Sequence, residues 1–295
     1  MKIKIKKNNS IIFTAGLALF GAVIIFIAAN SGNKIANNTG NKNGEVNVVV
    51  SILPQIEFVK SVGKDKVSVS AMIPPGFSPT TYEPSVEQLK KLSVADLYIR
   101  IGHIPFEKAQ MKKLASLNPK MKVIDSSEGI EIYKGDPHIW LSPRLAKIQV
   151  ENICQALAEI DPVNKDFYEK NKNDYLIKLD NLNTELQNAF SGMKGKKILV
   201  FHPAFGYLAR DYGFEQIAIE VEGKEPSAEN LARIIDTAKK ENIKTVFVQK
   251  QFSQKSAKAI AQQIGGNVVP LDPLAKNYVE NLRRIGENIS SKRTQ

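Results

Sequence analysis

The sequence predicts an α/β protein of two lobes, in which parallel sheets are covered by helices and one long rigid helix joins the lobes. Two observations predict this class. From Val46 onward, short β-branched runs alternate with amphipathic helical patterns, which is typical of parallel sheets with helices on their faces. One long helical pattern interrupts the alternation near the middle of the chain. We therefore expect a cleft between two lobes that this helix connects.

The first series of elements occupies residues 46–160 and should form the N-terminal lobe. Its expected strands are Val46–Ile52, Val67–Met72, Leu97–Ile101 and Met121–Ile124, and its expected helices are Gln55–Ser61, Val86–Leu92, Phe106–Leu114 and Pro143–Ile160. The second series occupies residues 196–295 and should form the C-terminal lobe. Its expected strands are Lys197–Phe201, Gln216–Glu220, Thr245–Gln249 and Asn267–Pro270, and its expected helices are Ala204–Tyr212, Ser227–Glu241, Ser253–Ile264 and Asn277–Ile289.

The connecting segment, residues 161–195, has the pattern of one long helix. Asp161 is suited to be its N-cap and Pro162 its first helical residue. Apolar residues then recur at steps of three and four, at Tyr175, Leu179, Leu182, Leu186 and Phe190. A helix from Pro162 to Phe190 would be roughly 43 Å long at 1.5 Å per residue. Such a helix predicts a stiff connection between the lobes.

The N-terminus has the pattern of a targeting segment. Residues 1–9 carry four lysines, and residues 11–29 are uncharged and mostly apolar. We expect residues 1–30 to be a signal peptide or an N-terminal membrane anchor, with residues 11–29 long enough to cross a bilayer. Residues 31–45 are rich in Asn, Gly and Lys and should form a flexible tether. This arrangement places the lobes outside the cytoplasm, at the cell surface or in the periplasm.

The composition excludes two classes of function. The formal net charge is +11, but residues 1–45 hold six basic residues and one acid, which leaves about +6 for the rest. A basic stripe interleaved with aromatic residues is absent from the sequence, so we expect no nucleic-acid binding. Cys154 is the only cysteine, which rules out an internal disulfide and a cysteine-based zinc cluster. Its helical pattern predicts a buried thiol.

The three histidines and one aspartate stand at the ends of expected strands or in loops next to them. His103 follows Leu97–Ile101, His202 follows Lys197–Phe201, and Asp272 follows Asn267–Pro270, while His138 lies in a loop just before a helix. In parallel sheets the carboxyl ends of the strands line the binding crevice. All four side chains are therefore candidates for one inter-lobe cleft. Imidazole nitrogens with a carboxylate suit Zn²⁺, and Mn²⁺ or Fe²⁺ are the alternatives.

Three segments resemble the metal-binding solute-binding proteins of zinc and manganese ABC transporters. They are Ile73–Pro84 (IPPGFSPTTYEP), Asp136–Pro143 (DPHIWLSP) and Phe201–Tyr207 (FHPAFGY), with weaker similarity at Val221–Ser227 and Leu271–Leu274. The resemblance extends over residues 46–291. It implies two α/β lobes joined by a rigid helix, one divalent metal in the cleft as transported ligand, and the permease subunits of an ABC importer as partners.

By this resemblance His138, His202 and Asp272 correspond to family ligands. The chain departs from the family at Thr80, where histidine is common. A neutral Thr hydroxyl is a poor zinc ligand. The fourth position would then be filled by His103 from the same lobe, by water, or by Glu83, whose more plausible role is to cap its loop. Asp136 is suited to orient an imidazole by accepting its second ring hydrogen.

The expected function is capture of a divalent transition metal, with zinc favoured, and its delivery to the importer by a monomeric receptor. A zinc hydrolase with Glu83 as general base is the alternative from the class of enzymes. The His-Glu-x-x-His pattern of such enzymes is absent from the sequence, so we expect no catalysis. A surface adhesin is the third hypothesis for the function. A histidine-rich loop is also absent, which leaves manganese or iron open as the metal.

Overall fold

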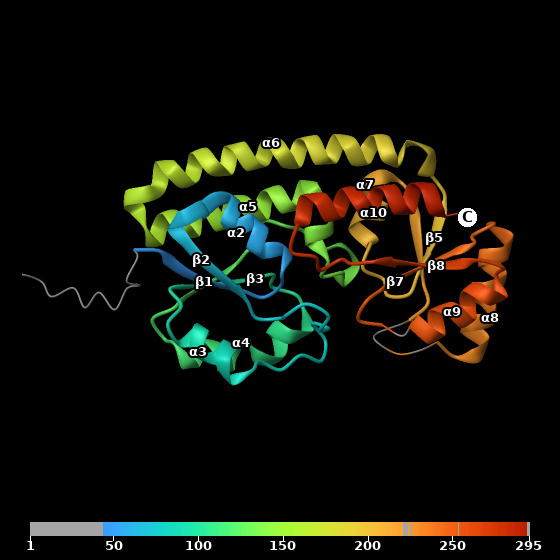
Figure 1. Cartoon of the computed structure of the whole chain (residues 1–295), viewed down its shortest axis with the longest axis horizontal. Coiled ribbons are helices and arrows are strands. Elements are labelled where there is room, and N and C mark those ends of the chain that lie inside the picture. The colour runs from blue at the N-terminus through green and yellow to red at the C-terminus, as the bar shows by residue number, and fades with distance from the viewer. Residues whose placement is uncertain (1–43, 221–223, 225, 253, 294–295) are drawn as a thin grey trace, which may run out of the picture. The chain divides into compact units, whose positions relative to one another are not determined.

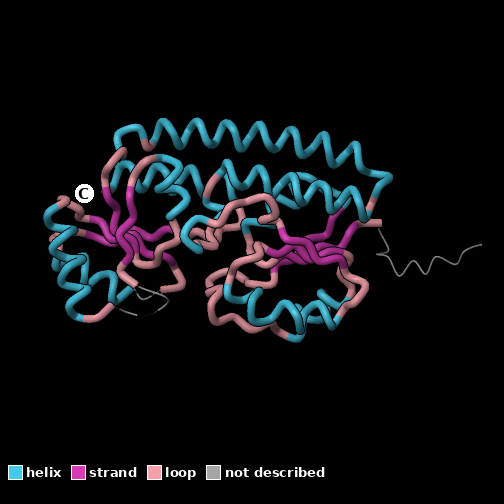
Figure 2. Tube along the Cα trace, turned by 180° about the vertical axis from the view of Figure 1, so that it is seen from behind, coloured by secondary structure: helices cyan, strands magenta, loops and turns pink. Residues whose placement is uncertain are grey.

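Two four-stranded parallel sheets form the framework of the protein (Figures 1 and 2). The computed structural model describes residues 44–220, 224, 226–252 and 254–293. The expected signal or anchor segment and most of the expected tether, up to residue 43, lie outside the described residues. None of the described helices is both long and apolar enough to cross a membrane.

The two sheets have the same strand order. The first has the order β2-β1-β3-β4, formed by β1 (Val46–Val50), β2 (Val67–Ala71), β3 (Leu97–Arg100) and β4 (Lys122–Asp125). The second has the order β6-β5-β7-β8, formed by β5 (Lys197–Val200), β6 (Glu215–Ala218), β7 (Thr245–Gln249) and β8 (Asn267–Leu271). All neighbouring strands are parallel. The order reverses between β1 and β3 and between β5 and β7, and ligands bind outside the carboxyl ends of strands at such points.

Helices cover both faces of each sheet, as buried parallel strands require. In the first lobe these are α2 (Pro54–Gly63), α3 (Val86–Ser93), α4 (Pro105–Leu117) and α5 (Pro143–Ile160). In the second they are α7 (Gly206–Tyr212), α8 (Ala228–Lys240), α9 (Gln254–Gln263) and α10 (Tyr278–Lys292). Figure 1 shows α2 and α5 on one side of the first sheet and α3 and α4 on the other. The predicted fold class is confirmed, with element bounds that differ by a few residues.

The single cysteine has the environment that the sequence predicted. Cys154 of α5 is buried, and burial raises the pKa of its thiol to about 11.

The long connecting helix is α6 (Lys165–Ala189), which is shorter than the sequence predicted. Pro162–Asn164 forms a separate 3-10 turn, η4. The Asp161 carboxylate accepts hydrogen bonds from Asn164 Nδ2 at 2.7 Å and from the Tyr168 hydroxyl at 2.6 Å, so it does not cap a helix amide as predicted. Over 25 residues α6 is roughly 38 Å long. It packs on α2 and α5 of the first lobe and on α10 of the second, so one straight element contacts both lobes.

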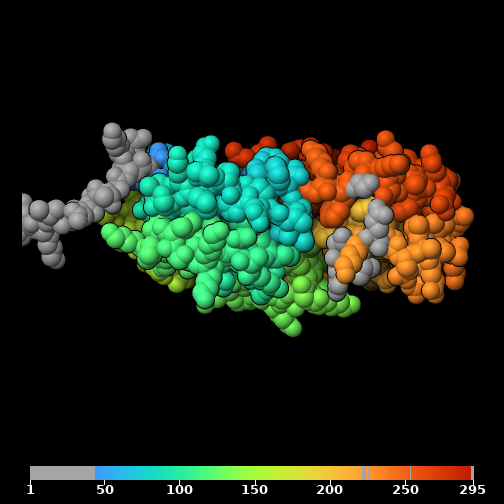
Figure 3. Space-filling view, turned by 90° about the horizontal axis from the view of Figure 1, so that it is seen from below, coloured from blue at the N-terminus to red at the C-terminus, as the bar shows by residue number. Residues whose placement is uncertain are grey.

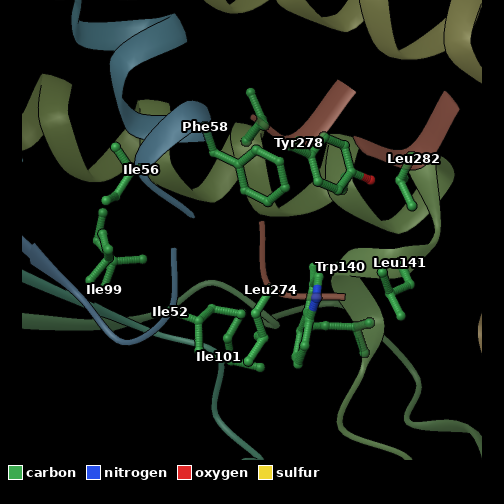
Figure 4. Close-up of a cluster of buried hydrophobic side chains, with 14 of the residues drawn as sticks. Ile52, Ile56, Phe58, Ile99, Ile101, Trp140, Leu141, Leu274, Tyr278 and Leu282 are labelled. Carbon is green, nitrogen blue, oxygen red and sulfur yellow. The ribbon is translucent and has the colours of Figure 1, made fainter. Parts of the chain in front are cut away.

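One hydrophobic cluster is shared by the two lobes. It extends from β1 and β3 through α2, α5 and α6 to α10. Figure 4 shows its centre, where Phe58 of α2 contacts Tyr278 of α10, with ring centroids 4.7 Å apart, and where Leu274 lies beside Trp140. A second cluster lies between the second sheet and α8 and α9. Because the larger cluster crosses from lobe to lobe, separating the lobes would expose apolar surface to water. Each Å² of that surface would cost about 25 cal/mol of free energy.

Glu57 of α2 adds a polar connection at the same junction. Its carboxylate accepts hydrogen bonds from the backbone amides of Tyr278 at 2.5 Å and Val279 at 3.4 Å, which are first-turn amides of α10. It also accepts the Tyr175 hydroxyl of α6 at 2.9 Å. A carboxylate at a helix N-terminus satisfies unpaired amides and opposes the helix dipole. Glu57 therefore joins the first lobe, the connecting helix and the second lobe.

We expect Glu57→Ala to lower the free energy of unfolding by about 1–3 kcal/mol, because two amides and one hydroxyl lose their acceptor. Thermal unfolding followed by circular dichroism measures the change, at roughly 2–4 °C per kcal/mol for a domain of this size. Glu229→Ala is the matched control, since Glu229 is an exposed acid in the first turn of α8. Equal melting temperatures for the two variants would contradict the role of Glu57.

Candidate metal centre

A cavity of about 880 Å³ lies where the carboxyl ends of the two sheets meet. Its walls come from the loops that follow β2, β3 and β4 in the first lobe and β5, β6, β7 and β8 in the second. The residues that carry polar or aromatic groups into it include Thr80, Thr81, Lys134, Asp136, His138, Trp140, His202, Glu220, Gln251 and Phe252. Figure 3 shows the side of the molecule on which the first lobe, in cyan and green, meets the second, in orange.

His202 follows β5 and is held on three sides. Its backbone amide donates to Gln249 Oε1 at 3.2 Å, and Gln249 Nε2 donates to its carbonyl at 2.8 Å. The ring stacks on Phe252, with centroids 4.8 Å apart and planes 18° apart. Gln249 is the last residue of β7 and fully buried. The strands next to each other in the sheet therefore fix the backbone and the ring plane of His202.

Glu220 holds the second ring nitrogen of His202. His202 Nδ1 lies 2.6 Å from Glu220 Oε1, and the Glu220 residue is 2% exposed. The other carboxylate oxygen, Oε2, is buried without a hydrogen-bond partner among the described residues. A buried carboxylate beside an imidazole makes Nδ1 the protonated nitrogen and leaves a lone pair on Nε2. Glu220 was not predicted as a site residue, although it is an acid at the end of an expected strand, Gln216–Glu220.

His138 has the same arrangement in the first lobe. Its Nδ1 lies 2.6 Å from Asp136 Oδ1, and its backbone amide donates to the same oxygen at 2.9 Å. Asp136 thus orients the imidazole in the way the sequence predicted. The ring packs edge-on against Trp140, with centroids 5.2 Å apart. In both imidazoles of the cleft, Nδ1 therefore contacts a carboxylate oxygen.

The two histidine rings meet across the cleft. His138 Nε2 lies 3.3 Å from His202 Nε2. Two zinc–nitrogen bonds of 2.0–2.1 Å at a tetrahedral angle separate the nitrogens by roughly 3.3–3.4 Å. The observed separation has this value. Two lone pairs that face each other at this distance repel, and a shared cation removes the repulsion. The pair is thus shaped for a metal ion between the rings.

Hydrogen bonds between the lobes hold this separation. The Tyr207 hydroxyl donates to the Asp136 carbonyl at 3.0 Å and accepts from the Tyr133 amide at 2.9 Å. Trp140 Nε1 donates to the Pro273 carbonyl at 2.8 Å. Tyr207 and Pro273 belong to the second lobe, and the other three residues to the first. The loop that carries His138 is therefore fixed to the lobe that carries His202.

The other predicted ligands lie beside the cavity. Asp272 Oδ1 accepts the Leu274 amide at 3.0 Å, and its Oδ2 lies 3.9 Å from Lys250 Nζ. Its neighbours Pro273 and Leu274 line the cavity, but Asp272 is not among the described lining residues. His103 is not among them either, while Ile104 and Pro105 are. Within the described part of the chain, no group of three or more His, Cys, Asp or Glu side chains is placed to hold a metal.

The remaining candidates of the first lobe differ in position. Thr80 lines the cavity and is exposed. Glu83 is exposed and does not appear in the described cavity wall. The expected segment around Val221–Glu225 lies largely outside the described residues. The structure thus brings His138 and His202 together, with Thr80 in the same wall.

Burial lowers the pKa of His202 below its ordinary value of 6.5, and the neighbouring His138 lowers it further, while Glu220 opposes both effects. A lowered pKa keeps the ring neutral in mildly acidic solution. The neutral ring is the form that binds a metal.

Comparison with known proteins agrees with this picture of a two-lobed metal receptor. The family model of the periplasmic zinc-uptake complex component A, ZnuA, matches residues 48–292. The high-affinity zinc uptake system protein ZnuA of Bacillus subtilis is 29% identical over 281 residues, which is 88% of each chain. A crystal structure of ZnuA is 45% identical, with a TM-score of 0.82, and the match covers 84% of this chain and 99% of that one.

The structure of Zn(II)-bound AdcA from Streptococcus pneumoniae is 30% identical, with a TM-score of 0.73. The match covers 85% of this chain and 58% of AdcA, so the protein spans little more than half of that relative. The fold and the facing imidazoles define a metal-binding receptor with two α/β lobes. The chain belongs to the periplasmic zinc-uptake complex component A family.

Family membership confirms the resemblance seen in the three sequence segments. The family is described as a periplasmic component of a zinc-uptake complex, which agrees with the expected function as a receptor and with the expected extracytoplasmic location. The ligand roles of His138, His202, Asp272 and His103 stay predictions.

We expect Glu220→Gln to weaken zinc binding about 10- to 100-fold, because a neutral amide oxygen accepts the Nδ1 hydrogen more weakly than a carboxylate and the negative charge behind the ring is lost. Isothermal titration calorimetry of residues 44–295 measures the affinity. Glu215→Gln is the control, since Glu215 is an exposed acid on β6, the strand that precedes Glu220. The proposed role of Glu220 fails if both variants bind zinc like the wild type.

Zinc affinity should depend on pH with a defined sign. Protons and zinc compete for Nε2, so affinity falls as pH drops through the pKa of His202. Because that pKa lies below 6.5, the contribution of His202 should be intact at pH 7 and decline only below 6.5. Titrations with zinc between pH 8 and pH 5 test this. A decline that is already complete at pH 7 would contradict the lowered pKa.

Proposed function

We propose that this protein captures a zinc ion in its inter-lobe cleft, with His138 and His202 as ligands, and delivers the ion to an ABC importer. The 3.3 Å separation of the two Nε2 atoms is the observation that carries the assignment, since it matches two adjacent corners of a zinc tetrahedron. The pairing of each Nδ1 with a carboxylate supports it, because both free lone pairs then point to one place. Membership in the ZnuA family supports the transport role.

Asp272 is proposed as the third ligand and His103 as the protein candidate for the fourth. The position of Asp272 at the end of β8, beside the lining residues Pro273 and Leu274, supports its assignment. A small movement that exchanges its contact with Lys250 for zinc would add an anionic oxygen. His103 has the weaker support, since only its neighbours Ile104 and Pro105 line the cavity.

The partners follow from the proposed transport role. The permease subunits of the importer would receive the ion, and we propose that the receptor acts as a monomer. Residues 1–30 would export the chain or anchor it, with residues 31–45 as the tether between membrane and receptor. Zinc is the proposed cargo, and manganese and iron are the competitors to be measured beside it.

A receptor role is favoured over catalysis. The proposed general base of the alternative hydrolase, Glu83, is exposed and does not line the described cavity. The carboxylates that do line it, Asp136 and Glu220, already accept the ring hydrogens of the histidines. Both contact the histidines at Nδ1, on the side of each ring away from the Nε2 atoms between which the metal would lie. We therefore propose that the protein is not an enzyme.

The central test is zinc binding by residues 44–295, the part that contains the whole family match. One equivalent of zinc should bind and raise the melting temperature, because a ligand that binds only the folded state stabilises it by RT ln(1 + [L]/Kd). His138→Ala and His202→Ala should each abolish the shift. The receptor assignment is wrong if zinc, manganese and iron all leave the melting temperature unchanged.

The ligand set has its own test. Asp272→Ala should weaken zinc binding by about tenfold or more, because zinc sites rest on three or four protein ligands. The same measurement on His103→Ala decides the fourth position. Unchanged affinity in His103→Ala would remove this histidine from the site and leave the fourth position to another donor. Lys250→Ala is the control for Asp272, because it removes the competing ion pair while keeping the carboxylate.

A further inference from the structure

Helix α7 (Gly206–Tyr212) is connected to the segments of both proposed histidine ligands. It follows the second-lobe histidine in the sequence, and it contacts the His138 loop (Tyr133–Ser142) of the first lobe. The Tyr207 hydroxyl bonds two backbone groups in the first half of this loop. The Asp211 carboxylate accepts the side-chain hydroxyl of the last loop residue, at 2.5 Å. One short helix therefore holds both ends of the His138 loop.

Arg210 joins these two contacts of α7. Its guanidinium donates to Asp211 Oδ1 from Nε at 3.0 Å and from Nη2 at 2.8 Å. It also lies over the rings of Tyr207 and Tyr133, 4.8 Å and 5.6 Å from their centroids. The Asp211 side chain is 3% exposed, so its charge is paired where water is largely excluded. These contacts fix the distance between α7 and the loop.

The first residue of α7 is a glycine, and the Asp136 carboxylate occupies the space beside it. A Cβ atom at Gly206 would lie 2.4 Å from Asp136 Oδ2 and 3.3 Å from Gln216 Nε2. The first distance is shorter than the normal contact between a carbon and an oxygen that are not bonded. The φ angle of Gly206 is not positive, so its backbone conformation would admit alanine. The close approach of Asp136 is therefore what requires a glycine here.

The place of the Asp136 carboxylate sets the orientation of His138. Asp136 Oδ1 contacts His138 Nδ1 at 2.6 Å and accepts the His138 amide at 2.9 Å. His138 Nε2 in turn lies 3.3 Å from His202 Nε2. Because the carboxylate is rigid, Oδ2 cannot be pushed aside without moving Oδ1. A shift of this group would turn the imidazole and change the separation of the two Nε2 atoms.

We propose that Gly206 and Tyr207 are positioning residues for zinc binding. They act on His138 through the Asp136 carboxylate and the loop backbone. Gly206 leaves the space that the carboxylate needs, and Tyr207 holds the loop at its distance from α7. Because α7 follows His202, the helix sets one histidine with respect to the other. The inference rests on the proposed function, since it takes both histidines as zinc ligands.

Gly206→Ala is the first test. The added methyl group should displace the Asp136 carboxylate and weaken zinc binding about tenfold or more, as when a metal-binding histidine loses its carboxylate partner. Alanine has the higher helix propensity, so a role of Gly206 in folding alone predicts an equally or more stable protein with unchanged affinity. Competition with a chelator measures the zinc affinity of the full-length variants, and thermal unfolding measures their stability.

Gly192→Ala is the matched control for this substitution. The φ angle of Gly192 is not positive either. A Cβ atom at Gly192 meets no atom within 4 Å beyond its chain neighbours, in the part of the chain that the structure describes. We expect this variant to bind zinc like the wild type. The visible absorption of bound Co²⁺, which reports the geometry of the ligands, should change in Gly206→Ala and stay unchanged in Gly192→Ala.

A double-mutant cycle shows whether the effect passes through Asp136. Asp136→Ala removes the carboxylate and should itself weaken zinc binding about 10- to 100-fold. In this background Gly206→Ala has no carboxylate to displace. We therefore expect at most about a twofold further loss of affinity.

Tyr207→Phe tests the same coupling without adding an atom. It removes the hydroxyl that bonds the loop and keeps the buried ring. We expect zinc affinity to fall roughly 2- to 30-fold, the range by which contacts between two sites change their coupling. Tyr212→Phe is the control, since the Tyr212 hydroxyl donates to Asn183 of α6 at 3.0 Å rather than to the His138 loop. It should bind zinc like the wild type.

Lower affinity in Gly206→Ala and Tyr207→Phe, with no further loss in the Asp136→Ala background, supports the inference. It is overturned if Gly206→Ala binds zinc like Gly192→Ala, or if its effect is the same with and without the Asp136 carboxylate. Equal zinc affinities of Tyr207→Phe and Tyr212→Phe would overturn it as well. Absence of zinc binding by the wild type would instead refute the proposed function.

Discussion

The site depends on the fixed packing of α10 against α2 and α6. Each lobe supplies one imidazole, and the separation of the two Nε2 atoms is set by how the lobes sit on each other. A hydrophobic cluster that crosses between them and the carboxylate of Glu57 at the start of α10 hold that arrangement. The straight helix α6 contacts both lobes. A preformed pair of donors loses little conformational entropy when it binds. The helices on the far side of the sheets from the metal therefore contribute to its affinity.

The electrostatics of the cleft follow from two carboxylates behind the two rings. Asp136 and Glu220 accept the Nδ1 hydrogens and leave their negative charge beside the site. Two neutral rings with two carboxylates balance the charge of one divalent ion. The charge of Glu220 is the more costly of the two to bury, because the residue is almost fully buried and one of its oxygens lacks a partner among the described residues. Burial of such an anion is costly unless a cation compensates it. The buried carboxylate of Glu220 therefore favours the binding of a cation in the cleft.

Much of the fold was predictable because its signals are local. The alternation of β-branched and amphipathic runs predicted the two sheets, and the motifs around His138 and His202 predicted that both side chains would face one cleft, where their Nε2 atoms lie 3.3 Å apart. Other features depend on contacts between distant residues. The Asp161–Pro162 pair was predicted to start α6, but Asp161 bonds side chains of Asn164 and Tyr168, and a 3-10 turn intervenes. Glu220 acquires its role only through a ring 18 residues away. Whether Asp272 and His103 reach the metal depends on loop conformations that a sequence pattern does not encode.

The shared strand order of the two sheets has a consequence for affinity. Each half of the chain presents one carboxylate-backed imidazole, and a single imidazole holds zinc weakly in water. Joining the halves turns the second bond into an intramolecular step, whose strength is set by the effective concentration of one ring near the other. In this protein that concentration is fixed by rigid packing. A substitution that weakens the packing between the lobes would therefore lower the effective concentration of one ring near the other. It would weaken metal binding without replacing any ligand residue.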